Sequence, residues 1–344
     1  MWWIYPVYVL DLVLMIFLSI ELGNLVDMLD KKTKISGAFI GGVLLAAVTS
    51  LPELFTAFSS IFLVHNASFV VGDILGSIIF DLVVLALETF IWVKHFGDAK
   101  FQKWHVFNGL FCLGMYLLAA YAFFAPKEWQ VMLGDINLMS ILILGLYILT
   151  LVLQPKTSDE DEEGEEDEKA ANWTLKKIII LFSVCAVLLI GSSIALTYLT
   201  SLIQEAIPAL SGSVAGALLL GIGTSIPEII STAQLFHKKN YDAGYGNMIG
   251  SCTFDFGILA LADMVSWHQM NPGLNNVVDR GIFIAEPDAI QFEIAGLAVC
   301  AGVVAFCALR YFTKLFQNKK VLGYVLTGIL ATGCVAGYLL VFIL

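Results

Sequence analysis

The chain has 344 residues, of which 59% are hydrophobic and only 14% are charged, and its formal net charge is -11. Soluble domains contain about 25% charged residues, so this composition excludes an ordinary soluble enzyme and a disordered chain, and it indicates a polytopic membrane protein. Residues 159–168 alone carry nine acidic side chains. The acidity therefore belongs to one segment, and it argues against nucleic-acid binding.

Apolar segments long enough to cross a bilayer follow one another along the whole chain. The first residues, MWWIYPVY, lack the basic region and the cleavage site of a signal peptide, so they are interpreted as the start of the first span. The six cysteines lie in apolar segments without a CxxC pair, so buried thiols are expected rather than disulfides or a zinc site. At about 20 apolar residues per spanning helix, ten spans are predicted, at residues 3–27, 36–63, 69–93, 105–124, 132–153, 175–200, 208–236, 245–267, 289–312 and 321–343.

Lysine and arginine are strongly biased to alternate loops between these spans. Sixteen of the 18 lie in the odd-numbered loops, and the even-numbered loops hold only Lys127 and Arg280. Cytoplasmic loops carry the excess of positive charge in membrane proteins. We therefore expect both termini to be extracellular, the acidic loop 155–174 to be cytoplasmic, and the chain to lie in the cell membrane. The oligomeric state is not predicted.

Two sequence motifs occur twice. Residues 41–53 read GGVLLAAVTSLPE, and residues 216–228 read GALLLGIGTSIPE, at an offset of 175. Residues 72–82 read GDILGSIIFDL, and residues 246–256 read GNMIGSCTFDF, at an offset of 174. The repeat unit contains five spans, an odd number, so the second copy must cross the membrane in the opposite direction, as in many secondary transporters.

The predicted fold is an all-α polytopic membrane protein, with ten transmembrane helices arranged as two inverted five-helix repeats. The first repeat covers residues 1–154, and the second covers residues 175–344. The extended motifs occupy residues 41–58, 72–86, 216–233 and 246–260.

Four acidic side chains, Glu53, Asp81, Glu228 and Asp255, lie within the repeated motifs. Each charge at membrane depth costs roughly 2.5–3.5 kcal/mol on insertion scales, so their symmetric placement favours an ion site over helix packing alone. Hydroxyl side chains stand four residues from each acid, on the same helix face. A proline beside each glutamate also frees a backbone carbonyl in its helix.

Such an all-oxygen cluster suits hard cations such as Ca²⁺, whereas softer metals prefer imidazole or thiolate. Asp73 and Asn247 stand one turn from the motif serines and are second-tier candidates. The predicted ion ligands are Thr49, Ser50, Glu53, Ser77, Asp81, Thr224, Ser225, Glu228, Ser251 and Asp255.

The paired T-S-x-P-E and G-[DN]-x-x-G-S-x-x-F-D motifs resemble those of the cation/Ca²⁺ antiporter superfamily, specifically its sodium/calcium exchanger branch, over nearly the whole chain. The resemblance implies an antiporter rather than an enzyme. Such an antiporter needs no cofactor, and it exports a divalent cation in exchange for inward Na⁺ by alternating access. The family's ligands fall on the ten residues above, with backbone carbonyls near Ala46 and Gly221 in addition. Ser and Pro stand shortly before each motif Glu, where the H⁺/Ca²⁺ branch typically has Asn, and this favours Na⁺.

Two features depart from the simplest exchangers of this family. Asp73 stands where they usually have Asn, and Asp81 and Asp255 are both acidic where one of them is usually Asn. The Phe-Asp endings are more similar to those of K⁺-dependent exchangers. An H⁺/Ca²⁺ antiporter, an exchanger of Mg²⁺ or Mn²⁺, and K⁺ dependence therefore stay open as alternatives.

Two other classes of protein are less favoured. One is a passive cation channel, which counterflow stimulation of transport would separate from an antiporter. An intramembrane aspartyl protease needs one aspartate pair that shares a proton, which explains neither the two glutamates nor the duplication. The expected partners are Ca²⁺, Na⁺ and the lipid bilayer.

Overall fold

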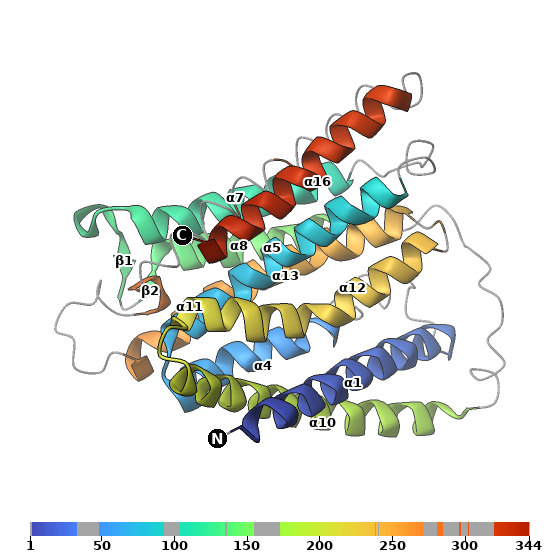
Figure 1. Cartoon of the computed structure of the whole chain (residues 1–344), viewed down its shortest axis with the longest axis horizontal. Helices are drawn as coiled ribbons and strands as arrows, with labels where there is room; N and C mark the ends of the chain where they lie inside the picture. The colour runs from blue at the N-terminus through green and yellow to red at the C-terminus, as the bar shows by residue number, and fades with distance from the viewer. Residues whose placement is uncertain are drawn as a thin grey trace.

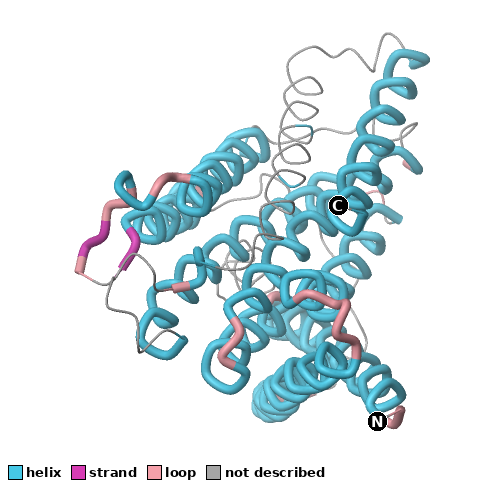
Figure 2. The backbone as a smooth tube through the Cα atoms, turned by 60° about the vertical axis from the view of Figure 1, so that its left-hand side comes forward, coloured by secondary structure: helices cyan, strands magenta, loops and turns pink. Residues whose placement is uncertain are grey.

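The computed structural model describes residues 2–32, 48–92, 104–134, 136–154, 173–237, 239, 241–270, 281–284, 296, 302 and 320–343. Within these ranges the chain is mostly helical, and its strands form a single two-stranded ribbon (Figures 1 and 2). Ala46, the acidic run 159–168 and almost all of the predicted span 289–312 lie outside the described residues.

The first half of the chain contains helices of unequal length and two short irregular helices. Its elements are α1 (Ile4–Lys32), α4 (Leu51–Ser59), the π-helix η2 (Ser60–Val64), α5 (Ala67–Ile91), α7 (Trp104–Phe124), the 3₁₀-helix η3 (Lys127–Trp129), β1 (Met132–Leu133), β2 (Ile136–Asn137) and α8 (Leu138–Leu153). Strands β1 and β2 pair antiparallel, with Met132 opposite Asn137. The span predicted from residue 132 therefore becomes helical only at Leu138, where the Asn137 side chain accepts a hydrogen bond from the Met139 N–H at 2.9 Å and caps the helix.

The second half repeats the pattern of long helices with one π-helical turn. Its elements are α10 (Leu175–Ala206), α11 (Gly212–Ala215), the π-helix η4 (Gly216–Gly221), α12 (Ile222–His237), α13 (Tyr241–Met270), the 3₁₀-helix η6 (Ile282–Ile284) and α16 (Lys320–Ile343).

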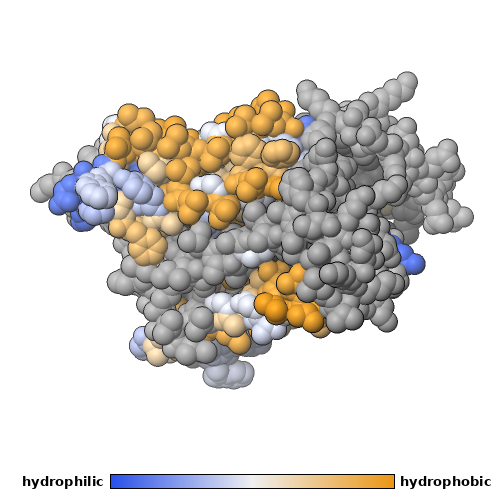
Figure 3. All heavy atoms as spheres, turned by 90° about the horizontal axis from the view of Figure 1, so that it is seen from above, coloured by the Kyte–Doolittle hydropathy of each residue, from blue (hydrophilic) through white to orange (hydrophobic). Residues whose placement is uncertain are grey.

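Six of the described helical segments are long and apolar enough to cross a membrane: Ile4–Leu25, Ala67–Ile91, Trp104–Phe124, Leu175–Ala206, Gly212–His237 and Ala243–Ser266. Shorter apolar helices cover Leu51–Val64, Leu138–Leu153 and Val325–Gly337. Each of these helices overlaps one of the predicted spans. The outer surface supports a membrane setting, because apolar side chains such as Leu10 and Val187 are more than two-thirds exposed. Figure 3 shows apolar residues spread over one such face.

The helices that carry the repeated motifs lie at the centre of the fold. Helix α5 packs against η4, α12 and α13, and α4 packs against α5 and α10. Apolar side chains of α5, α7 and α13, among them Ile74, Met115 and Phe256, form one buried cluster. A second cluster joins α1 to α10 through residues such as Met15 and Leu189. The motif helices are thus held between the α1–α10 pair and the helices α7, α8 and α16.

Both termini lie toward the same end of the molecule. Figure 1 shows the start of α1 and the end of α16 toward the left, the end that also carries β1 and β2, and shows α1 and α10 running in opposite directions along the lower edge. Exposed tryptophans also mark this end, with Trp2 at 82% and Trp129 at 66% of full exposure. Aromatic rings of this kind are typical of a membrane–water interface.

Candidate ion-binding site

The first T-S-x-P-E motif lies where one helical segment stops and another starts. Ser50 has backbone angles of φ -91° and ψ 13°, outside the helical region, and α4 begins at the next residue. Pro52 occupies the first turn, a position where its missing N–H breaks no helical hydrogen bond. Glu53 also lies in this first turn, near the positive end of the helix dipole.

The second copy of this motif has a different local structure. Here the irregular turn comes earlier, as the π-helix η4, and α12 runs through Pro227 without a break. The Thr224 hydroxyl donates to the Leu220 carbonyl at 3.1 Å. The two prolines were expected to loosen their helices in the same way, but the two copies differ. The first copy has a break at Ser50, and the second has a π-helical turn before α12.

Helix α5 approaches η4 so closely that side chains cannot fit between them. A Cβ atom placed on Gly221 would lie 2.8 Å from the Asp73 carbonyl oxygen and 2.9 Å from the Ser77 nitrogen. A Cβ on Gly216 would lie 2.6 Å from the Phe69 carbonyl oxygen. Small residues permit such contacts between membrane helices, and here they bring the first-half motif helix onto the backbone of the second half.

Hydrogen bonds connect the predicted ligands of the two halves. The Ser50 hydroxyl donates to Glu228 Oε1 at 3.3 Å and lies 3.5 Å from the Ser251 hydroxyl. The Ser77 hydroxyl donates to the Gly221 carbonyl at 3.1 Å and lies 3.5 Å from the Thr224 hydroxyl. Residues separated by 144 to 201 positions in the chain thus meet at one place.

Most of the remaining predicted ligands also lie near these residues. Ser225 and Ser251 lie close enough to the Asp81 carboxyl to act on its charge. The Glu53 carboxyl group lies near those of Asp81, Glu228 and Asp255. All ten predicted ligand side chains are buried, with at most 4% of any of them exposed, and this includes Thr49.

The carboxyl groups of this cluster are largely without hydrogen-bond donors. The atoms that are buried without a partner are Glu53 Oε2, Asp73 Oδ1, Glu228 Oε2 and both carboxyl oxygens of Asp81 and of Asp255. Burying an unpaired charge is very costly, so this arrangement calls for bound cations or protons.

The carboxyls do not form a metal cage by themselves. Among the described residues, no three His, Cys, Asp or Glu side chains converge on one point closely enough to hold a metal ion. A cation at this site would therefore need hydroxyl and carbonyl oxygens as well as one or two carboxylates. Ca²⁺ accepts mixed oxygen ligands of this kind.

The second-tier candidates occupy two similar positions. Asp73 Oδ2 accepts a hydrogen bond from the Thr56 hydroxyl at 2.5 Å, which joins α5 to α4. Asn247 Nδ2 donates to Ser231 at 3.1 Å and to Thr232 at 3.0 Å, which joins α13 to α12. The Gly221 carbonyl faces the site, as its bond from Ser77 shows.

Sequence reasoning missed three residues that support the site. Thr56 and Ser231 hold Asp73 and Asn247, and both are hydroxyl residues separated by the repeat offset of 175. That matched pair was a visible signal. The third is Tyr8, whose hydroxyl donates to the Leu219 carbonyl of η4 at 2.5 Å. Nothing in the local sequence of α1 marks Tyr8 for this contact.

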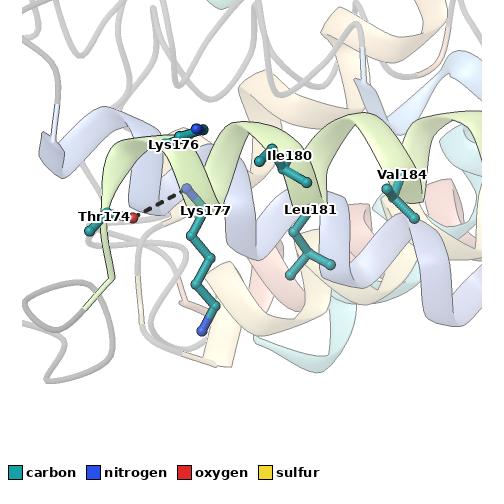
Figure 4. Close-up of a pocket in the computed structure, with 6 residues that line it drawn as sticks. All are labelled: Thr174, Lys176, Lys177, Ile180, Leu181 and Val184. Atoms are coloured by element: carbon teal, nitrogen blue, oxygen red, sulfur yellow. Dashed lines mark hydrogen bonds between the residues drawn. The ribbon is translucent and has the colours of Figure 1, made fainter.

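A separate pocket lies on the surface of α10. It has a volume of about 370 Å³, and Figure 4 shows its six lining residues on one stretch of that helix. Lys177 stands over the Trp173 ring, with Nζ 3.7 Å from the ring centre. The lining contains two lysines and no carboxyl group, so it is not the cation site. The lining residues are Thr174, Lys176, Lys177, Ile180, Leu181 and Val184.

Comparison with known protein families gives a direct result for both halves of the chain. The family described as "Sodium/calcium exchanger protein" matches residues 3–156 and 177–344. The chain belongs to the sodium/calcium exchanger family. The chain is 25% identical over 224 residues to an uncharacterized membrane protein of Methanocaldococcus jannaschii, and this match covers 65% of this chain and 68% of the relative.

Solved structures show the same fold. The H⁺/Ca²⁺ exchanger CAX has a TM-score of 0.66 at 12% identity, with 97% of this chain and 87% of that chain covered. YfkE has a TM-score of 0.62 at 16% identity, with coverage of 98% and 92%. The sodium–calcium exchanger NCX_Mj has a TM-score of 0.54 at 20% identity, with coverage of 96% and 98%. This family member is thus a helical membrane protein of the exchanger fold.

Proposed function

We propose that the protein is a secondary-active antiporter that exchanges Na⁺ for Ca²⁺ by alternating access at the buried carboxyl cluster. The observation that carries this proposal is the set of buried, unpartnered carboxyl oxygens contributed by both halves and surrounded by hydroxyls. Membership of the sodium/calcium exchanger family supports the class of activity. A transport site of this kind uses no cofactor, and it carries out no covalent chemistry.

The four motif acids have distinct roles in this proposal. Glu53 and Glu228 are the central ligands, because each lies in a T-S-x-P-E segment beside the irregular helix turns. Asp81 and Asp255 complete the cage from α5 and α13. The serine and threonine hydroxyls add neutral oxygens. A site filled with Ca²⁺ or Na⁺ is largely neutralised and can change its side of access, whereas an empty, strongly negative site cannot do so cheaply.

The proposed architecture is ten spans in two inverted repeats, with both termini outside the cell membrane and the acidic loop inside. It is supported by the shared end of the termini and by the lysine and arginine asymmetry of the sequence. Helices α1 and α10 pack chiefly on each other. They are therefore the candidates for the elements that move relative to the motif helices.

The number of buried acids favours a second candidate, in which H⁺ or K⁺ takes part in the exchange. Asp73 is fully buried beside the four motif acids, which makes five carboxyls at this depth. One divalent cation neutralises two charges, so additional cations or protons are expected. Transport of Mg²⁺ or Mn²⁺ is compatible with the same oxygen ligands.

Uptake of radiolabelled Ca²⁺ into proteoliposomes tests the proposal. Vesicles preloaded with Na⁺ are compared with vesicles that have no gradient or an outward H⁺ gradient, each with and without K⁺. Uptake that requires the Na⁺ gradient is expected. Uptake driven only by H⁺, or none for Ca²⁺ but uptake of Mg²⁺ or Mn²⁺, would replace Na⁺/Ca²⁺ exchange by the corresponding alternative, and a gradient-independent leak would indicate a channel.

A further inference from the structure

Helices α7 and α13 pack side by side in one well-defined register. Two aromatic ring pairs connect them, with ring centres 5.7 Å and 5.5 Å apart: His105–Tyr245 and Tyr116–Phe256. The two members of each pair are separated by 140 positions in the chain. A constant separation means that the helices run parallel. Cys112 and Cys252 are also 140 positions apart, and they lie between the two ring contacts.

Helical spacing places each of these cysteines on the packed face of its helix. Cys112 stands seven positions after His105 and four before Tyr116, and Cys252 has the same spacing relative to the aromatic residues of α13. Residues four and seven positions apart share one face of an α-helix. The Cys112 and Cys252 thiols accordingly lie near each other. Both are free thiols, and their side chains are buried.

Two more sulfur-containing side chains lie in the same region. Met115 stands three positions after Cys112, and Met248 stands four positions before Cys252. Both methionines are completely buried, and they belong to the same apolar cluster as the two cysteines. Thiolate and thioether sulfur are soft ligands that select ions such as Cu(I). This cluster therefore offers sulfur ligands where the transport site offers only oxygen.

The number of ligands favours a soft ion of low coordination number over zinc. A structural zinc site needs four ligands, usually from Cys and His. Among the residues that the structure describes, no three His, Cys, Asp or Glu side chains are placed to hold one ion. Two sulfur ligands are enough for Cu(I), which accepts linear coordination. One thiolate balances its single charge, and the second thiol and the thioethers add neutral sulfur.

We propose that Cys112 and Cys252 bind one soft monovalent cation, of the chemical class of Cu(I), at the contact between α7 and α13. One thiol proton is released to solvent when the ion binds, and no oxidation takes place. The Cys252 thiol also lies near the Asp81 and Asp255 carboxyls. The bound ion therefore adds positive charge beside the transport site and joins α13 to α7. This site goes beyond the proposed exchange, whose ligands are all oxygen atoms.

Competition for Cu(I) with the coloured chelator bicinchoninate tests the site on the purified full-length protein, under anaerobic reducing conditions. The starting protein has its other four cysteines replaced by alanine: Cys185, Cys300, Cys307 and Cys334. It should withdraw one Cu(I) per molecule from the chelator. Adding Cys112→Ala or Cys252→Ala should weaken binding by about 100-fold or more, because even the loss of a supporting residue costs about 10- to 100-fold in metal affinity.

A matched control separates loss of a ligand from loss of the fold. The variant that keeps only Cys185 and Cys334, two buried cysteines on α10 and α16, should not bind Cu(I) at this affinity. Thermal unfolding without copper checks that each variant is folded. The proposal is wrong if the protein with only Cys112 and Cys252 takes up no Cu(I), or if removing either thiol leaves the affinity unchanged. Because the measurement involves no transport, its outcome is independent of the proposed function.

Discussion

The two motif helices, α5 and α13, share a sequence pattern but differ in exposure. Every residue from 68 to 79 of α5 is buried, and its glycines are pressed against η4, where a Cβ on Gly76 would lie 2.7 Å from the Ala217 Cα. On α13, the equivalent positions Gly246, Asn247 and Gly250 are partly exposed. The first turns of the motif are thus buried in one half and partly exposed in the other, although the ligands Ser251 and Asp255 of α13 are themselves buried.

Under the proposed alternating access, the two sides of a symmetric site must differ from each other at any one time. If both motif helices were equally exposed, ions could pass through the site from one side to the other. If both were sealed, ions could not enter. In the described residues, the first motif turns are buried on α5 and partly exposed on α13. The following experiments test where the two halves are equal and where they differ.

The largest effect on transport is expected for the two motif glutamates, one from each half. Glu53→Gln and Glu228→Gln should each reduce Na⁺-driven Ca²⁺ uptake by about 10- to 100-fold, because a bond to a charged group contributes about 1.5–3 kcal/mol. Folding should be preserved, since the amide has the same shape. Glu88→Gln, on α5 but bonded only to the Trp92 ring nitrogen at 3.1 Å, is the control. Normal exchange by either glutamate variant would exclude it as a central ligand.

A cysteine pair tests the difference in access directly. With all six native cysteines replaced, Asn247→Cys should react with a water-soluble thiol reagent, whereas Asp73→Cys at the equivalent position should be protected. The measurement is the rate of modification of protein in liposomes. Equal rates at the two positions would mean that the difference in exposure between residues 73 and 247 does not persist in the membrane.

Glycine substitutions test how tightly the two motif helices, α5 and α13, are packed. Gly76→Ala should destabilise the protein by about 1–3 kcal/mol, because the new methyl group meets backbone atoms that cannot move away. Gly250→Ala should have little effect, since no described residue lies within 4 Å of a Cβ at that position. Thermal unfolding in detergent, followed for both variants, checks the contrast. A larger loss of stability for Gly250→Ala than for Gly76→Ala would contradict this prediction.

The smallest effect is expected at the contact between α1 and η4. Tyr8→Phe removes one buried hydrogen bond to Leu219 and should cost about 1 kcal/mol of stability. Ser183 on α10, at the repeat offset of 175 from Tyr8, is exposed, and its hydroxyl donates to the Ile179 carbonyl of its own helix at 2.9 Å. Ser183→Ala should therefore leave the unfolding temperature unchanged. Equal shifts in the unfolding temperature of both variants would mean that the hydrogen bond from Tyr8 to Leu219 does not stabilise the protein.

Much of this arrangement could be predicted because the repeat makes it visible. Apolar length located the membrane helices, and the duplicated motifs identified Glu53, Glu228 and the hydroxyls that the structure brings together. The mostly helical membrane fold and the exchanger family are confirmed.

The remainder depends on tertiary neighbours that similar local sequences do not specify. Two nearly identical T-S-x-P-E segments give a break at Ser50 in one half and a continuous helix through Pro227 in the other. The exposure of Asn247 against the burial of Asp73 likewise arises from the helices packed around them. A motif that occurs twice predicts two similar sets of ligands, but it does not predict two similar environments.

The π-helix η2 explains why the repeat offset changes from 175 to 174 between the two motifs. Glu53 and Gly72 are 19 positions apart, whereas Glu228 and Gly246 are 18 apart. A π-helical turn, with its i→i+5 hydrogen bonds, holds one residue more than an α-helical turn, and η2 lies within the longer interval. The extra residue of the first copy thus falls in the interval that holds η2, where a wider helical turn can accommodate it.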